Sequence, residues 1–271
     1  MLTRRQFLLT ASAVPFLQST EQIITVNGAI RPQQMGKTLI HEHLLVDFIG
    51  ADKISFDRWN REEVLKIVLP YLLEAKKRGV KTLLDCTPAF LGRDVHLLQL
   101  AAQKSGLQIL TNTGYYGAVD NKYLPKWAFT ETAEQLADRW TAEFENGIDG
   151  TDVRPGFIKI GVNPGPLSEL HRKLVRAAGL THLRTGLTIC SHTGPALAAF
   201  EEIEELQRTG VHPSAFVWVH AQSESNKNLY TKAAQTGAWV SLDGMGWGDW
   251  ENYASPCCVK KDLRKMILTN F

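Results

Sequence analysis

Five side chains in this sequence have the types and spacing of a metal site: His41, His43, Lys159, His192 and His220. His41 and His43 are separated only by Glu42, in a segment that we predict to be a strand. Because side chains alternate across a strand, both imidazoles should point to the interior and Glu42 outward. Imidazole is the commonest protein ligand of zinc and related divalent metals. The pattern therefore predicts metal-dependent chemistry.

Lys159 is the unusual member of this set, because it lies among apolar residues in the segment 156–162. A buried ammonium group is costly, so the pKa of Lys159 should fall. Reaction with carbon dioxide would convert its amine to a carbamate that can bridge two divalent metals, with the first histidine pair on one ion and His192 and His220 on the other. Zinc suits these ligands, with cobalt, manganese or iron as substitutes. Two ions about 3.5–4 Å apart would polarise a substrate and generate hydroxide from water.

A repeated pattern predicts the elements that position these residues. Amphipathic segments end in glycine and run into short apolar segments, at Gly79, Gly106, Gly186, Gly237 and, more loosely, Gly210. Gly79 and Gly106 are 27 residues apart, as are Gly210 and Gly237. Glycine just after a helix permits the left-handed cap that turns the chain into the next strand. The spacing is typical of a β/α repeat.

The predicted strands cover residues 38–46, 81–86, 108–113, 156–162, 187–192, 215–220 and 238–242. Residues 265–271 would be an eighth strand, one period further on. The expected fold class is therefore α/β, a (β/α)8 TIM barrel with strand 8 incomplete and the final helix missing. Residues 23–30 should form a hairpin turning on Asn27-Gly28 that covers the bottom or rim of the barrel. Active sites of this fold lie at the carboxyl ends of the strands, where His192 and His220 fall.

The motifs Gly36–Leu44 (GKTLIHEHL) and Gly156–Gly161 (GFIKIG), followed by His192 and His220, resemble the phosphotriesterase-like family of the amidohydrolase superfamily. The resemblance covers roughly residues 23–247. A lone His-x-His pair is a weak signal, because core histidines are common. Four histidines and the lysine in order on successive strands are a strong one.

The resemblance implies a role for each of these residues. His41 and His43 would bind the inner metal, Lys159 would bridge, and the later histidine pair would bind the outer metal. The expected catalytic residues are Lys159, His192 and His220. Tyr116 matches an aromatic residue that lines the family's substrate pocket; a rim residue covering apolar surface is the alternative. The remaining histidines are expected to be structural: His96, His171, His182 and His212.

Two carboxylates of the family pattern are absent from this sequence. The last ligand of the inner metal is an Asp at the end of strand eight, whereas this chain ends at Phe271, at or before that position. Gln222 lies in the segment after His220 where phosphotriesterases carry a proton-relay carboxylate. Asp243, after strand seven, has two interpretations: a substitute ligand, or a support for its loop. We therefore expect the inner metal to be held less well than the outer one.

Three functions are compatible with these residues. The first is a metal-dependent hydrolase that uses metal-activated hydroxide on phosphotriester, lactone or related ester bonds of a small-molecule substrate. The second is a truncated, catalytically impaired homologue that only binds metal or ligand. The third is a metal-dependent nuclease or other hydrolase of the same superfamily, against which Lys159 argues, because those relatives usually have Glu on that strand.

Composition narrows the classes of partner. The chain has 271 residues with 44% hydrophobic and 21% charged residues, which is ordinary for a globular protein. The formal net charge is only +2, and no basic run interleaved with aromatics occurs, so nucleic acid is not an expected partner. Cys86 and Cys190 lie in apolar strands and should be buried thiols rather than a disulfide. A homodimer is compatible with the sequence.

The first residues have the layout of an export signal. Arg4 and Arg5 directly precede the apolar stretch 7–17, which polar residues follow. The arginine pair resembles a twin-arginine signal; the alternatives are an ordinary secretory signal and a frayed N-terminal helix. Residues 1–20 are thus predicted to be a signal peptide and 21–271 a single hydrolase barrel, periplasmic or secreted. No apolar stretch reaches the ~20 residues that a membrane span needs.

Overall fold

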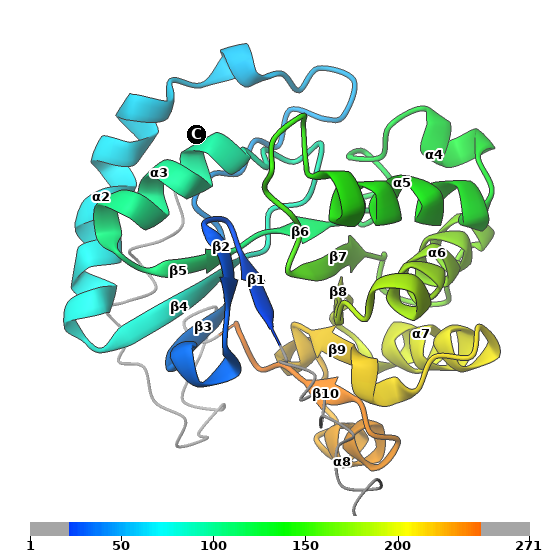
Figure 1. The fold of residues 1–271 in the computed structure, drawn as a ribbon. Coiled ribbons are helices and arrows are strands. Elements are labelled where there is room, and N and C mark those ends of the chain that lie inside the picture. Colours follow the sequence, from blue (N-terminus) through cyan, green and yellow to red (C-terminus); the bar gives the residue numbers. More distant parts are fainter. Residues whose placement is uncertain (1–21, 245–271) are drawn as a thin grey trace, which may run out of the picture.

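The computed structural model describes residues 22–244, shown as a ribbon in Figure 1. The predicted signal peptide, residues 1–20, and the predicted eighth strand, residues 265–271, lie outside the described residues. The segments predicted as strands one to seven all fall inside them.

Parallel strands form the centre of the molecule: β3 (Lys37–Glu42), β4 (Val80–Asp85), β5 (Gln108–Leu110), β6 (Asn112–Thr113), β7 (Phe157–Gly161), β8 (Ile189–His192), β9 (Phe216–Val219) and β10 (Trp239–Val240). They are hydrogen-bonded in the order β3-β4-β5 and β6-β7-β8-β9-β10. β5 and β6 are two parts of one predicted strand, interrupted at Thr111. All seven predicted strands in the described range are therefore present, each parallel to its neighbour in sequence, as the TIM-barrel interpretation requires.

Seven helices of the described residues surround these strands (Figure 1): α2 (Arg61–Lys77), α3 (Val95–Ser105), α4 (Trp127–Thr130), α5 (Ala133–Asn146), α6 (Glu169–Thr185), α7 (Ala196–Arg208) and α8 (Asn228–Gln235). Short 3-10 helices complete the connections: η1 (Pro32–Gln34), η2 (Phe56–Arg58), η3 (Pro213–Ala215) and η4 (Ala221–Ser223). Two helix ends have the glycine cap that the sequence pattern predicts. Gly106 and Gly186 cap α3 and α6 in the left-handed conformation, with φ of 66° and 74°.

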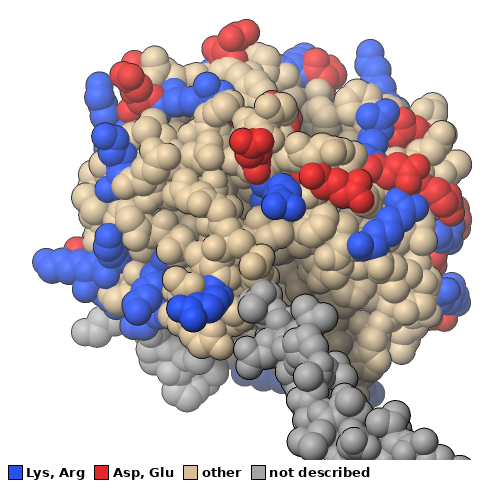
Figure 2. Space-filling model, viewed as in Figure 1, with Lys and Arg blue, Asp and Glu red and all other residues tan. Residues whose placement is uncertain are grey.

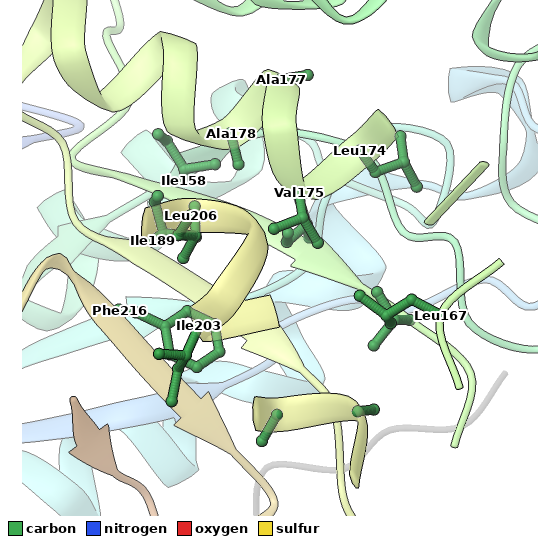
Figure 3. Close-up of a cluster of buried hydrophobic side chains, with 14 of the residues drawn as sticks. Ile158, Leu167, Leu174, Val175, Ala177, Ala178, Ile189, Ile203, Leu206 and Phe216 are labelled. Carbon is green, nitrogen blue, oxygen red and sulfur yellow. The ribbon is translucent and has the colours of Figure 1, made fainter. Parts of the chain in front are cut away.

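The main core lies between the strands and the outer helices (Figure 3). Ile158 and Ile189 come from neighbouring strands, and Ile203 and Leu206 come from α7; none is more than 3% exposed. Ile203 and Leu206 therefore belong to an apolar stripe on the inner face of α7. On α2, Val68 and Leu72 are buried, whereas Leu73 is 45% exposed, because helical periodicity places it beyond the edge of the buried face.

The predicted hairpin is present as β1 (Ile23–Thr25) and β2 (Gly28–Ile30). Thr25 pairs with Gly28, so the turn is at Val26-Asn27, one residue earlier than predicted. The backbone N–H of Val26 donates to the carbonyl of Ile109 at 2.8 Å, near the start of β5. The hairpin therefore lies at the amino ends of the strands, opposite the predicted site.

Charged side chains of both signs are interspersed over the face shown in Figure 2, with uncharged surface between them. Cys86 and Cys190 are buried free thiols within the strand region, as predicted. Within residues 22–244, no helix combines the length and the apolar character that crossing a bilayer demands.

Candidate metal centre

The strand register gathers the predicted residues at one end of the molecule. His41 lies near the end of β3, and His43 is the first residue after this strand. Lys159 lies in β7, and His192 is the last residue of β8, paired with Gly161 and Val219 on its two neighbours. His220 follows β9. Because the strands are parallel, their carboxyl ends meet at one edge, where the four histidines lie, and Lys159 lies two residues before the end of its strand.

The imidazoles of four of these residues are in contact. The ring centroids of His41 and His220 are 4.7 Å apart and nearly stacked, and those of His192 and His220 are 4.5 Å apart. His41 Nε2 and His43 Nε2 lie 3.3 Å from each other. Two imidazole nitrogens this close point to a common position, which is the arrangement that a shared metal ion needs.

Asp243 links two of the histidines from the loop after β10. Its Oδ2 lies 3.2 Å from His41 Nδ1, and its Oδ1 lies 2.6 Å from His220 Nδ1. Ser241 Oγ also donates to Oδ2, at 2.7 Å. A carboxylate that accepts from Nδ1–H leaves Nε2 of each ring unprotonated and able to bind a metal. Asp243 therefore orients His41 and His220, a role that neither interpretation from sequence, substitute ligand or loop support, included.

The same residues also allow a different arrangement. Ligand atoms of His41, His220 and Asp243 lie within 4.8 Å of one another, so Asp243 could itself complete a three-residue metal site. The 2.6 Å contact with His220 favours the orienting role, because a hydrogen bond of that length already occupies Oδ1.

His43 is oriented by Thr87, which follows β4. Thr87 Oγ1 lies 2.9 Å from His43 Nδ1 and donates its single hydrogen to the carbonyl of Leu45, also at 2.9 Å. The hydroxyl must therefore accept from His43 Nδ1–H, which leaves Nε2 unprotonated and able to bind a metal. Asp85 supports the same region by accepting from the backbone of Leu44 and Thr87.

Lys159 is 1% exposed, and its amine makes one long hydrogen bond, of 3.4 Å from Nζ to the carbonyl of Ile160. Within residues 22–244, no carboxylate forms an ion pair with it. Burial lowers the pKa of the Lys159 amine. A neutral amine is the form that reacts with carbon dioxide, so this poorly satisfied side chain fits a carbamate that bridges metals.

Electrostatics favour neutral imidazoles here. Burial lowers the pKa of His41 to about 4, despite the hydrogen bond to Asp243, and burial also lowers the pKa values of His43 and His192 well below the ordinary range. Burial opposes ionisation of Asp243, but hydrogen bonds from His220 and His41 outweigh it and hold the pKa of that carboxyl well below its usual range. The site thus offers unprotonated nitrogens near neutral pH, as metal binding requires.

Two further observations concern the edge of the site. His220 has φ of 60°, a left-handed conformation that costs a non-glycine residue about 1–3 kcal/mol and is typical of functional sites. The Tyr116 ring meets His192 edge-on, with centroids 5.0 Å apart, and its backbone pairs with Gly161. Tyr116 therefore borders the candidate centre, and its role in substrate binding stays a prediction.

The structure also places the residues that sequence reasoning set aside or missed. His96 and His212 are exposed, away from the centre, and His171 is buried on α6, where its Nε2 bonds the carbonyl of Gly117. Thr87 and Asp85 were not predicted. Both could have been found from the sequence, because they are polar residues at the carboxyl end of the predicted strand 81–86, where active-site residues of this fold lie.

Comparisons with known proteins identify the family of the chain. The profile of the Phosphotriesterase family matches residues 21–266. The chain belongs to the phosphotriesterase family. That family has the (β/α)8 barrel fold and belongs to the amidohydrolase superfamily, so the fold and the resemblance inferred from sequence are both confirmed.

Individual relatives carry different names. A phosphotriesterase homology protein of Escherichia coli is 30% identical over 212 residues, which are 78% of this chain and 70% of that protein. An aryldialkylphosphatase of Saccharolobus solfataricus is 28% identical over 220 residues, 80% of this chain and 69% of that protein. An N-acetyltaurine hydrolase of Mus musculus is 27% identical over 276 residues, 91% of this chain and 78% of that protein. These names support a hydrolase and leave its substrate open.

Proposed function

We propose that this phosphotriesterase-family protein is a dinuclear metal hydrolase that cleaves phosphotriester, lactone or related ester bonds of small molecules. The observation that carries the proposal is the convergence of His41 Nε2 and His43 Nε2 beside Lys159, which is buried and has no carboxylate partner among the described residues. His41, His43, Lys159, His192 and His220 would hold the ions, with Lys159 as the bridging carbamate. Zinc fits these donors, with cobalt, manganese or iron as alternatives.

The bound ions would polarise the scissile bond and make hydroxide available near neutral pH. The chain's own residues prepare the centre for this chemistry. Asp243 and Thr87 hold three imidazoles with Nε2 unprotonated. Burial of Lys159 favours the neutral amine that forms the carbamate. Tyr116, beside His192, would line the substrate site.

The relatives' names define which substrates to compare. An aryl ester, a lactone and a phosphotriester represent the proposed class, and N-acetyltaurine represents the amide named for the mouse relative. If the protein hydrolyses only N-acetyltaurine, the reaction at this centre is amide hydrolysis and not the proposed ester hydrolysis. Stoichiometric metal without turnover of any of these substrates would support the alternative, a homologue that only binds metal or ligand.

The test combines metal analysis with the substitution Lys159→Ala. Wild-type protein should hold two divalent ions per chain, and Lys159→Ala should lose most of them. Adding a short carboxylic acid should restore part of the metal, because the free carboxylate can replace the carbamate. Lys104→Ala, an exposed lysine on α3, is the control and should keep its metal. If wild-type protein holds no stoichiometric metal and Lys159→Ala matches it, the proposal is wrong.

A further inference from the structure

A buried acid lies directly behind the candidate centre and is not among its ligands. Glu202 is on α7 and is 0% exposed, between that helix and β8. The described residues supply it with no salt-bridge partner, although burying a carboxyl group without a cation is unfavourable. Ile203 and Leu206 of the same helix belong to the main apolar core (Figure 3). A carboxyl group in such a place needs a reason beyond packing.

Its hydrogen bonds supply that reason. Ser191 Oγ donates to Glu202 Oε1, and Thr193 Oγ1 donates to Oε2 at 2.5 Å. Ser191 and Thr193 are the residues immediately before and after His192. Because side chains alternate along a strand, both hydroxyls point outward to α7 while the imidazole between them points inward. One carboxyl group thus holds both neighbours of His192.

His192 differs from the other candidate ligands in how it is oriented. The rings of His41 and His220 are held by Asp243, and the ring of His43 is held by Thr87. Within residues 22–244, the imidazole of His192 has no hydrogen-bond partner of this kind; it contacts the rings of Tyr116 and His220. Its direction is therefore set by its backbone, at the last residue of a strand where pairing stops.

We propose that Glu202 is a positioning residue for the metal centre. By clamping Ser191 and Thr193, it prevents the end of β8 from rotating and so aims His192 at the outer metal. This inference rests on the proposed dinuclear function, because it assigns Glu202 a task only if His192 is a ligand.

Three variants separate this role from packing and from charge. Glu202→Leu keeps the volume and removes both acceptors, and Thr193 retains another acceptor, the carbonyl of Ser191 at 3.1 Å, so the fold should persist. Glu202→Gln keeps one acceptor and one donor, which two rotatable hydroxyls can still satisfy. Glu205→Leu is the matched control: Glu205 is buried on the same helix but bonds Arg176 instead of β8.

The measurement is zinc binding to metal-free full-length chain, by titration against a chelator of known affinity. Loss of a residue that orients a metal ligand typically weakens binding about 10–100-fold. We expect Glu202→Leu to weaken one of the two sites by about that factor, while Glu202→Gln and Glu205→Leu keep wild-type affinity at both. Thr193→Val, which removes one hydroxyl with little change of shape, should show a smaller loss at the same site.

Each other outcome is informative. Two wild-type sites and an unchanged Glu202→Leu protein would overturn the inference alone. A Glu202→Gln protein as weak as Glu202→Leu would overturn the inference, because Gln keeps the hydrogen-bonding groups that positioning requires. If Glu202→Leu does not fold, unchanged affinity in Thr193→Val would overturn the inference. Wild-type protein without stoichiometric zinc would overturn the proposed function and this inference with it.

Discussion

Asp243 and Thr87 orient different numbers of histidines in the candidate centre. Asp243 contacts Nδ1 of both His41 and His220, which are assigned to different metals, whereas Thr87 contacts only His43. In the proposed dinuclear centre, a single carboxylate that orients one ligand of each ion would make the two metal sites depend on each other. Thr87 would affect only the proposed metal site that includes His43.

We therefore expect Asp243→Ala to weaken zinc binding at both sites, by about 10–100-fold each. Thr87→Val, its matched control, should weaken only the site that contains His41 and His43. Zinc titration of the metal-free proteins measures both. If Asp243→Ala loses one ion and leaves the other at wild-type affinity, Asp243 is a direct ligand instead of a shared orienting group.

The pH dependence of stability reports on Glu202. Burial raises the pKa of Glu202 to about 8 from an ordinary value of 4.5. The folded protein then holds this proton more tightly than the unfolded chain, so the contribution of Glu202 to stability falls as pH rises from about 4.5 to about 8. Glu202→Gln has no such proton, so its stability should decline less over this range. Urea unfolding midpoints of metal-free protein between about pH 5 and 8 measure the difference, and parallel curves would contradict it.

At the scale of elements, helix α7 contributes residues both to the apolar core and to the support of the candidate centre. Its inner face contributes Ile203 and Leu206 to the core and Glu202 to the end of β8. Its outer face carries Leu197, which is 53% exposed. The stability of the helix therefore depends on apolar contacts, and the position of His192 depends on one polar residue beside them.

Leu206→Ala should destabilise the protein by about 2–5 kcal/mol, because Leu206 is fully buried and its removal leaves a cavity. Leu197→Ala, at an exposed position of the same helix, should change the free energy of unfolding by about 0.5 kcal/mol or less. Urea unfolding measures both values. Equal effects of the two substitutions would mean that α7 does not pack as described.

At the scale of the whole molecule, the parallel arrangement brings residues from distant repeats to one edge. His41 and Asp243 are 202 positions apart in the chain and are joined by a hydrogen bond. The hairpin β1–β2 lies at the opposite ends of the strands and contacts β5. One end of the molecule thus carries the candidate chemistry, and the other carries structural contacts.

We propose that Arg4 and Arg5, outside the described residues, direct export of the protein through the twin-arginine pathway. Replacing both with Lys keeps the charge, which an ordinary secretory signal would tolerate, but should leave the precursor in the cytoplasm of a bacterium with this pathway. Fractionation and immunoblotting measure the distribution. Unchanged export of the Arg4→Lys, Arg5→Lys double variant would show that the signal is of the ordinary type.

Local patterns in the sequence determined much of this protein. The alternation around His41 and His43, the glycines after the helices and the apolar segments predicted the strands, their order and the end at which His192 lies. These features are readable because they depend on neighbours within one element. The family motifs added the prediction of which histidines belong together, and the family itself is confirmed.

Only the tertiary structure decided how those side chains are held. The contacts of Asp243 with two histidines, of Thr87 with His43 and of Glu202 with both neighbours of His192 join separate repeats. No periodicity encodes such contacts, because they depend on the register of strands and on how a helix packs against them. The ligand types could therefore be predicted from the sequence, whereas their orientation follows from the packing of the whole chain.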